Sequence, residues 1–216
     1  IYSGAEEALA VFASRFNIPI IETQAGKSAV AQAHPMNLGA SGVDGSAAAN
    51  AAAGAADLVI GVGTRFQDCT TGSWSLFKAP GVRLVSVNIQ PYDAAKHGAV
   101  SLVADARVAL NRLSAAIGSY RGVVDAKARA DWLAAVDAHC AAPKDGNALP
   151  TDAQVIGAVQ RATGKDAIAM CAAGTMPGAL KLLWQASERG YHMEYGFSCM
   201  GYEIAGAMGV KLAAPG

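Results

Sequence analysis

The sequence has 216 residues, of which 52% are hydrophobic and only 16% are charged, whereas about a quarter of the residues in a typical domain are charged. Lysine plus arginine equals aspartate plus glutamate at 17 each, which argues against nucleic acid or an anionic membrane as a partner. No apolar run reaches the roughly 20 residues that cross a bilayer. The four cysteines contain no CxxC pair, so we expect a well-buried α/β protein of the cytoplasm.

The first 140 residues alternate between helical and strand-like patterns, which is typical of βαβ winding on a mainly parallel sheet. Leu9, Phe12 and Phe16 are spaced i, i+3, i+7 and predict a first helix with one core face. Asp105 and Asp125 are positioned to begin two later helices. The expected strands are 18–21, 57–63 and 82–89, and the expected helices are 45–56, 105–117 and 125–140.

The pattern restarts after residues 141–149, which include proline, glycine and asparagine and form the predicted linker. Beyond it, Thr151 is expected to cap a helix that continues through Val159, followed by a strand at 167–173 and a helix at 178–189. The sequence therefore predicts a central domain at 1–140, a doubly wound and mainly parallel sheet with helices on both faces and its first strand missing. Residues 150–216 are predicted to be the truncated beginning of a second α/β domain.

Gly61 and Gly63 follow the clearest predicted strand and at first suggest a dinucleotide-binding fingerprint. Phe66 stands where the third glycine of that fingerprint belongs, and no helix is evident at this point. We interpret the motif as a glycine-assisted turn at the carboxyl end of a strand. The polar loop that follows, at 67–74, lies at the edge where open parallel sheets bind ligands.

Two segments of the second domain carry the clearest ligand signals. Residues 172–178 lie between a predicted strand and a helix, where small side chains let backbone N–H groups approach a phosphate. Residues 195–209 hold Met200 among polar neighbours, ahead of a helix rich in glycine and alanine. Two interpretations of this second segment stay open. Either a ligand approaches its backbone closely, or the helix is a tightly packed core element with Met200 as gap filler.

The order of these segments resembles that of the thiamine-diphosphate-dependent enzymes of the acetolactate synthase type. A strand, Gly174-Thr175 and a helix are followed by Ser-Cys-Met-Gly-Tyr at 198–202, as in the diphosphate domain of that family. Residues 63–72 resemble the corresponding loop of its central domain, so the matches cover nearly the whole chain. Within the family, 63–74 and 191–203 are most similar to decyclizing hydrolases of myo-inositol catabolism, which open a trihydroxylated cyclic 1,2-dione to 5-deoxy-glucuronate.

The resemblance implies thiamine diphosphate and Mg²⁺ as cofactors. In the family, an apolar wedge, here Met200, folds the two cofactor rings together, and the main-chain carbonyl of the residue matching Ser198 accepts a hydrogen bond from the aminopyrimidine. The magnesium loop and the glutamate that activates the aminopyrimidine are expected outside this sequence, so the chain alone is expected to be inactive. The implied cofactor contacts are Ala173, Gly174, Thr175, Met176, Ser198, Cys199 and Met200.

His192 and Glu194 share one face if their stretch is extended, and either could move protons. A polar pair on a surface strand is the simpler interpretation, and no catalytic residue is assigned. The family also implies a small-molecule substrate and a homodimer or homotetramer. A 2-oxo acid carboligase or decarboxylase and a malonic semialdehyde decarboxylase stay open as alternatives. For the first 140 residues, a flavin- or ADP-binding module or a purely structural domain also stays open.

Overall fold

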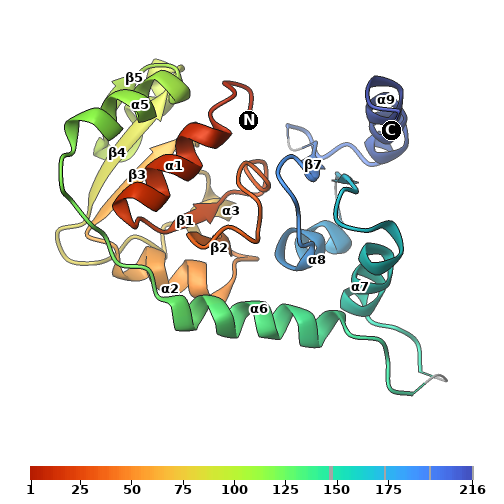
Figure 1. The fold of residues 1–216 in the computed structure, drawn as a ribbon. Coiled ribbons are helices and arrows are strands. Elements are labelled where there is room, and N and C mark those ends of the chain that lie inside the picture. Colours follow the sequence, from red (N-terminus) through yellow and green to blue (C-terminus); the bar gives the residue numbers. More distant parts are fainter. Residues whose placement is uncertain (146–147, 173, 195, 216) are drawn as a thin grey trace.

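The structure, a computed structural model, describes residues 1–145, 148–172, 174–194 and 196–215. Within these ranges the strands pair in parallel, in three small sheets flanked by helices (Figure 1). The sheets are β1 (Ile20–Glu22) with β2 (Asn37–Ala40); β3 (Leu58–Val62), β4 (Arg83–Asn88) and β5 (Val100–Val103) in that order; and β6 (Ala169–Cys171) with β7 (Tyr191–Met193). The predicted parallel α/β architecture is confirmed.

Four of the described helices begin after a residue whose side chain accepts a free backbone N–H group. Asp105 and Asp125 each accept a hydrogen bond from the N–H three residues ahead, and Thr151 forms a capping box with Gln154. These three predicted helix starts are therefore confirmed. The helices are α1 (Glu6–Phe16), α2 (Ala47–Ala55), α3 (Asp68–Thr71), α4 (Pro91–Ala94), the 3₁₀ turn η1 (Lys96–Gly98), α5 (Ala106–Ala116), α6 (Ala126–Cys140), α7 (Asp152–Thr163), α8 (Thr175–Leu183) and α9 (Tyr202–Ala213).

Strand β3 carries packed elements on both of its faces. Its residues Ile60 and Val62 pack against the phenylalanines of α1 and against α5. Val59 instead packs into a cluster formed by α2 with Phe66 and Phe77 of the following loop. Because successive side chains of a strand point to opposite faces, this alternation places helices on both sides of the sheet, as predicted.

Helix α6 connects the two parts of the chain (Figure 1). It packs against α2 and β2 along its first part and against α7 and α8 further along. Its buried Trp132 and Val136 belong to one core cluster that also contains Leu38 of β2 and Trp184, which follows α8. A Cβ atom at Gly39 would come within 2.5 Å of the Trp132 ring, so only glycine fits beneath that ring. The division at residues 141–149 stays a prediction.

A buried polar cluster joins the loop after β1 to strand β7. Glu22 Oε1 accepts hydrogen bonds from the Ser28 backbone N–H at 3.1 Å and from Asn37 Nδ2 at 3.2 Å. The Ser28 hydroxyl donates to the Tyr191 carbonyl and accepts from the Tyr191 N–H, both at 3.2 Å. Burial raises the pKa of Glu22 and lowers that of Lys27, its buried neighbour. The Ser28 side chain thus pairs with β7 as a neighbouring strand would.

The predicted helix at 178–189 is wrong at both ends. Helix α8 begins at Thr175 because Pro177, which lacks an N–H, is tolerated in the first turn of a helix. It ends at Leu183, after which the buried Trp184 donates its indole N–H to the Gly190 carbonyl at 3.1 Å. The sequence predicts a strand at 167–173, and the observed strand, β6, is shorter and covers only Ala169–Cys171.

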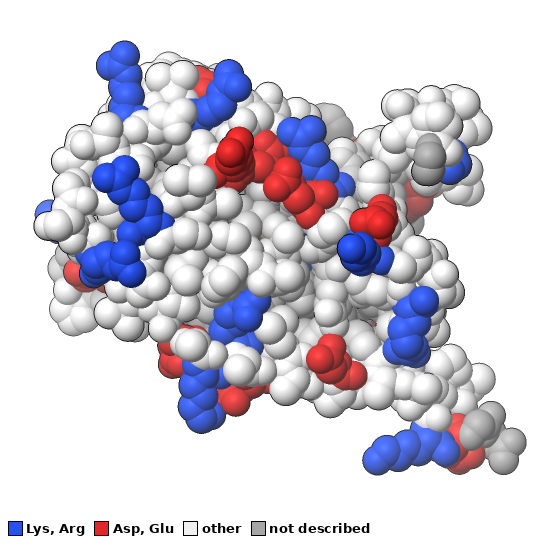
Figure 2. Space-filling view, viewed as in Figure 1, with Lys and Arg blue, Asp and Glu red and all other residues white. Residues whose placement is uncertain are grey.

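The visible surface is mainly uncharged, with basic and acidic side chains both spread across it (Figure 2). This agrees with the low charged share and the balanced charge of the sequence. Over the described ranges, none of the helices is long and apolar enough to cross a membrane.

Candidate cofactor site

Strands β6 and β7 bring the predicted cofactor contacts to one place. They are parallel neighbours, with Cys171 paired to Met193 at their carboxyl ends. Two segments leave this edge side by side: the β6 turn (Ala172 and 174–176) and the β7 loop (196–201). Ligands of open α/β sheets bind outside the carboxyl ends of the strands. Ala173, another predicted contact, lies outside the described residues.

The β6 turn leads directly into the exposed first turn of α8. Gly174 has a φ of +120°, which favours glycine, and it precedes the first helical residue, Thr175. Among the described residues, no side chain accepts a hydrogen bond from this first turn. Thr175 and Met176 are exposed there, so their N–H groups, which have no acceptor within the helix, are available to an anion.

The β7 loop presents Met200 at the surface. Ser198 and Gly201 both have left-handed backbone, at φ +51° and +94°, so the chain turns sharply on each side of Met200. The side chain of Met200 is 83% exposed, and that of Phe197 is 90% exposed. Met200 fills no core gap within the described residues, and its side chain is accessible to a ligand there; its role stays a prediction.

Glu194 holds the β7 loop through its carboxylate. Its Oε2 accepts the Cys199 N–H at 2.9 Å, and its Oε1 accepts the Phe197 N–H at 3.1 Å. These backbone N–H groups, that of Cys199 first, hold the pKa of Glu194 below its usual range. His192 lies within β7, and its Nε2 is 3.0 Å from the hydroxyl of Tyr202. The two proposed proton carriers therefore have different partners, and their catalytic role stays a prediction.

Glu203, which the sequence reasoning missed, connects the two segments. Its Oε1 accepts the N–H of Ala172 in the β6 turn at 3.1 Å, and its Oε2 accepts the N–H of Gly201 in the β7 loop at 2.9 Å. Backbone N–H groups, its own first and then those of Gly201 and Ala172, hold the pKa of Glu203 low. The available signal was that Glu203 is the only acidic residue in a helix otherwise rich in glycine and alanine.

The loop after β3 forms a second polar region, at the carboxyl edge of the central sheet. A Cβ atom at Gly61 would come within 2.4 Å of the Phe66 ring, and Gly63 has a φ of +64°. Gly61 is needed because a side chain would clash with Phe66, and Gly63 is favoured by its left-handed backbone. Both observations support the interpretation of this motif as a glycine-assisted turn. The loop at 67–74 is not wholly irregular, because α3 forms within it.

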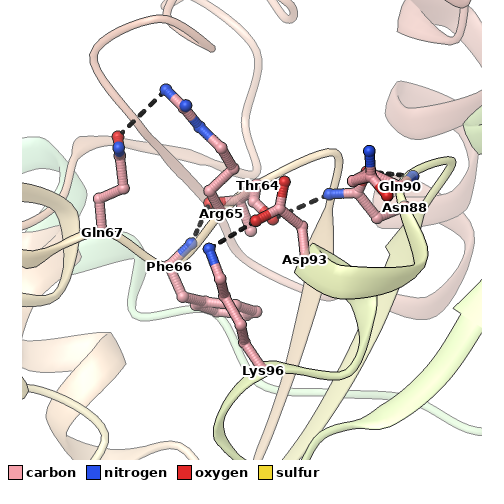
Figure 3. Close-up of polar contacts among 8 residues, drawn as sticks. All are labelled: Thr64, Arg65, Phe66, Gln67, Asn88, Gln90, Asp93 and Lys96. Carbon is pink, nitrogen blue, oxygen red and sulfur yellow. Dashed lines mark hydrogen bonds and ion pairs between the residues drawn. The ribbon is translucent and has the colours of Figure 1, made fainter.

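The polar side chains of this second region contact one another (Figure 3). Asn88 Nδ2 donates to the Thr64 carbonyl at 3.1 Å and joins the ends of β3 and β4. Arg65 reaches the side chain of Gln67 at 3.4 Å, and Lys96 forms an ion pair with Asp93. The flavin or ADP alternative for this edge stays a prediction. Across the described part of the chain, no group of three or more His, Cys, Asp or Glu side chains is arranged to hold a metal ion.

Comparisons with known proteins agree with this geometry. Residues 1–113 match the family described as "Thiamine pyrophosphate enzyme, central domain", and residues 172–216 match "Thiamine pyrophosphate enzyme, C-terminal TPP binding domain". The chain belongs to the thiamine pyrophosphate enzyme family. The second match begins at the β6 turn and includes the whole β7 loop, so it coincides with the segments that hold every predicted cofactor contact.

Three curated relatives have names that describe the same activity. The chain is similar to the 3D-(3,5/4)-trihydroxycyclohexane-1,2-dione hydrolases of Geobacillus thermodenitrificans (41% identical) and Clostridium perfringens (42% identical), in each case over 99% of this chain. A Bacillus cereus protein of the same description is 42% identical. The chain spans 37% and 38% of the lengths of the first two relatives.

Thiamine pyrophosphate, also called thiamine diphosphate, fits the residues present. Its diphosphate needs N–H donors on a backbone without bulky side chains, which the first turn of α8 provides after Gly174. Its rings need an apolar surface, and the exposed Met200 lies on the neighbouring segment. At Gly201, a Cβ atom would meet nothing within 4 Å in the described structure, so the space beside this glycine is open.

Proposed function

We propose that the full-length enzyme uses thiamine diphosphate and Mg²⁺ to hydrolyse the carbon–carbon bond between the two carbonyl groups of a trihydroxylated cyclic 1,2-dione. The observation that carries the proposal is that the turn into α8 and the Met200 loop leave neighbouring strands at one sheet edge, where Glu203 joins them. The proposed substrate is supported by the 41% identity between this chain, over nearly its whole length, and a trihydroxycyclohexane-1,2-dione hydrolase.

In this proposal, the residues of the chain bind and orient the cofactor. The N–H groups of Thr175 and Met176 bind the diphosphate, Met200 holds the two rings folded together, and the Ser198 carbonyl accepts from the aminopyrimidine. When bound, thiamine diphosphate supplies a nucleophilic thiazolium carbon and an electron sink for the bond that breaks. His192, with Tyr202 as its partner, is the candidate to hold or move a proton. The Glu194 carboxylate instead accepts hydrogen bonds from the backbone N–H groups of Phe197 and Cys199 in the loop.

The overall reaction consumes one water. The carbon–carbon bond between the two carbonyl carbons breaks, one of these carbons gains the hydroxyl group of water, and the other gains a hydrogen. The products of this cleavage are a carboxylate and an aldehyde at the two ends of one open chain, namely 5-deoxy-glucuronate.

We infer that the full-length enzyme is a homo-oligomer that works in a reducing compartment such as the cytoplasm. The family supports the first inference; the exposed Ile204, Met208 and Leu212 of helix α9 need cover either from the rest of the full-length protein or from a second subunit. The second inference is supported by the cysteines, all of which are free in the described structure, including the exposed Cys69 and Cys199.

A product assay on the full-length enzyme tests the proposal. The enzyme is incubated with the cyclic dione or with pyruvate, each with thiamine diphosphate and Mg²⁺ and again after both are removed. We expect the ring-opened acid from the dione only when the cofactors are present. Carboligation or decarboxylation of pyruvate without opening of the dione would instead assign the enzyme to the 2-oxo acid branch of the family.

A further inference from the structure

Two carboxylates accept backbone N–H groups of the β7 loop. Those of Phe197, Cys199 and Gly201 donate to carboxylates, the first two to Glu194 and the third to Glu203. The predicted cofactor contacts of this loop, Ser198, Cys199 and Met200, lie between Phe197 and Gly201 and are exposed. Carboxylates thus fix the backbone of the loop and leave the side chains of Ser198, Cys199 and Met200 exposed.

Of these two carboxylates, Glu203 contacts both cofactor segments. Glu194 acts within the β7 loop, whereas Glu203 joins Gly201 of that loop to Ala172 of the β6 turn. The two N–H donors belong to different strand ends, and a carboxylate is the side chain that offers two acceptor oxygens to two separate donors. Glutamine offers only one acceptor oxygen, so it cannot replace both hydrogen bonds.

The charge of Glu203 works against a direct role in binding the diphosphate. A carboxylate beside an anion-binding turn repels the anion unless N–H groups neutralise its charge. Both oxygens of Glu203 accept backbone N–H groups, so the side chain acts on the backbone. This argues for positioning of the two segments and against contact with the ligand.

We propose that Glu203 is a positioning residue that fixes the β6 turn, which binds the diphosphate, relative to the β7 loop, which holds the rings. The inference rests on the proposed use of thiamine diphosphate, and it extends that function to a residue outside the cofactor contacts. Both ends of one cofactor must be held at once, so loss of this link weakens cofactor binding and disturbs the placement of the rings.

The test compares Glu203→Gln and Glu203→Ala with the wild-type full-length enzyme. Glu188→Gln is the matched control, because Glu188 is an exposed carboxylate that precedes β7. The first readout is amide hydrogen exchange at Ala172 and Gly201 in the cofactor-free enzyme. The second is the Kd for thiamine diphosphate at saturating Mg²⁺, and the third is the melting temperature.

We expect Glu203→Gln to lose exchange protection at one of the two amides, and Glu203→Ala to lose it at both. The Kd for thiamine diphosphate should rise about tenfold in each, while Glu188→Gln behaves as wild type. A lower melting temperature with an unchanged Kd would mean a merely structural role and would overturn the proposal, as would unchanged protection at both amides. Cofactor binding that depends on Glu203 supports the role even if the wild-type enzyme fails to open the dione; that failure overturns the proposed substrate alone.

Discussion

Replacing Met200 by alanine separates a cofactor role from a stability role. Because the side chain is 83% exposed, its truncation removes little buried apolar surface. At roughly 25 cal/mol per Å² of apolar area, we expect the free energy of unfolding of the cofactor-free protein to change by less than about 0.5 kcal/mol. Truncation of a core methionine costs roughly 2–5 kcal/mol. The melting temperature should therefore stay close to that of the wild type.

The same substitution should strongly reduce turnover of the cofactor-saturated full-length enzyme. The wedge excludes extended cofactor conformers, and a deficit of roughly 1.4 kcal/mol in the folded population means about tenfold in rate. Met200→Leu keeps an apolar side chain of similar volume and should retain far more activity. Melting temperature and turnover per folded, cofactor-loaded molecule are measured on both variants. Unchanged turnover in Met200→Ala would refute the wedge assignment.

Three further predictions test other parts of the structure. Ser28→Ala should lower the stability of the chain by about 1–3 kcal/mol in denaturant unfolding, since the buried backbone of Tyr191 loses its partner; an unchanged midpoint would contradict this. The pKa of Glu194 lies below its usual value. The hydrogen bonds from the loop to its carboxylate are therefore lost only when the pH falls through this lowered pKa. Exchange protection of the Cys199 amide should thus persist at pH 4.5, where an ordinary glutamate is half protonated. Loss of protection at this pH would refute the role of the Glu194 carboxylate in holding the loop. Calorimetry of residues 1–216 with thiamine diphosphate and Mg²⁺ should show very weak binding or none. Micromolar affinity would mean that either the expected position of the metal loop or the predicted domain boundary is wrong.

Local signals predicted most of the helices. The caps at Asp105, Asp125 and Thr151 involve residues three apart in the sequence, so the local sequence alone identifies them. Pro177 and Gly178 favour the end of a turn, whereas helix α8 begins three residues before Gly178. Proline is compatible with a turn and with a first helical turn alike, and only the surrounding structure decides between them.

Features fixed by distant contacts were not predicted. Strand β2 includes asparagine and glycine, which are poor strand formers, and it is stabilised by Asn37, which donates to the buried Glu22. Residues 172–178 and 195–209 were found because small residues leave room for a ligand. The link from Glu203 to Ala172 joins residues 31 positions apart, and no local pattern predicts a hydrogen bond between a side chain and a backbone group at that distance.

Proton release during turnover tests the central claim most directly. Hydrolysis of a neutral cyclic dione produces a carboxylate and therefore one proton for each ring opened, whereas decarboxylation of a 2-oxo acid to carbon dioxide consumes one. In a pH-stat, the full-length enzyme should release one proton per dione consumed, only with thiamine diphosphate and Mg²⁺ present, and leave pyruvate unchanged. Proton uptake with pyruvate, or dione opening that is independent of thiamine diphosphate, would contradict the proposed function.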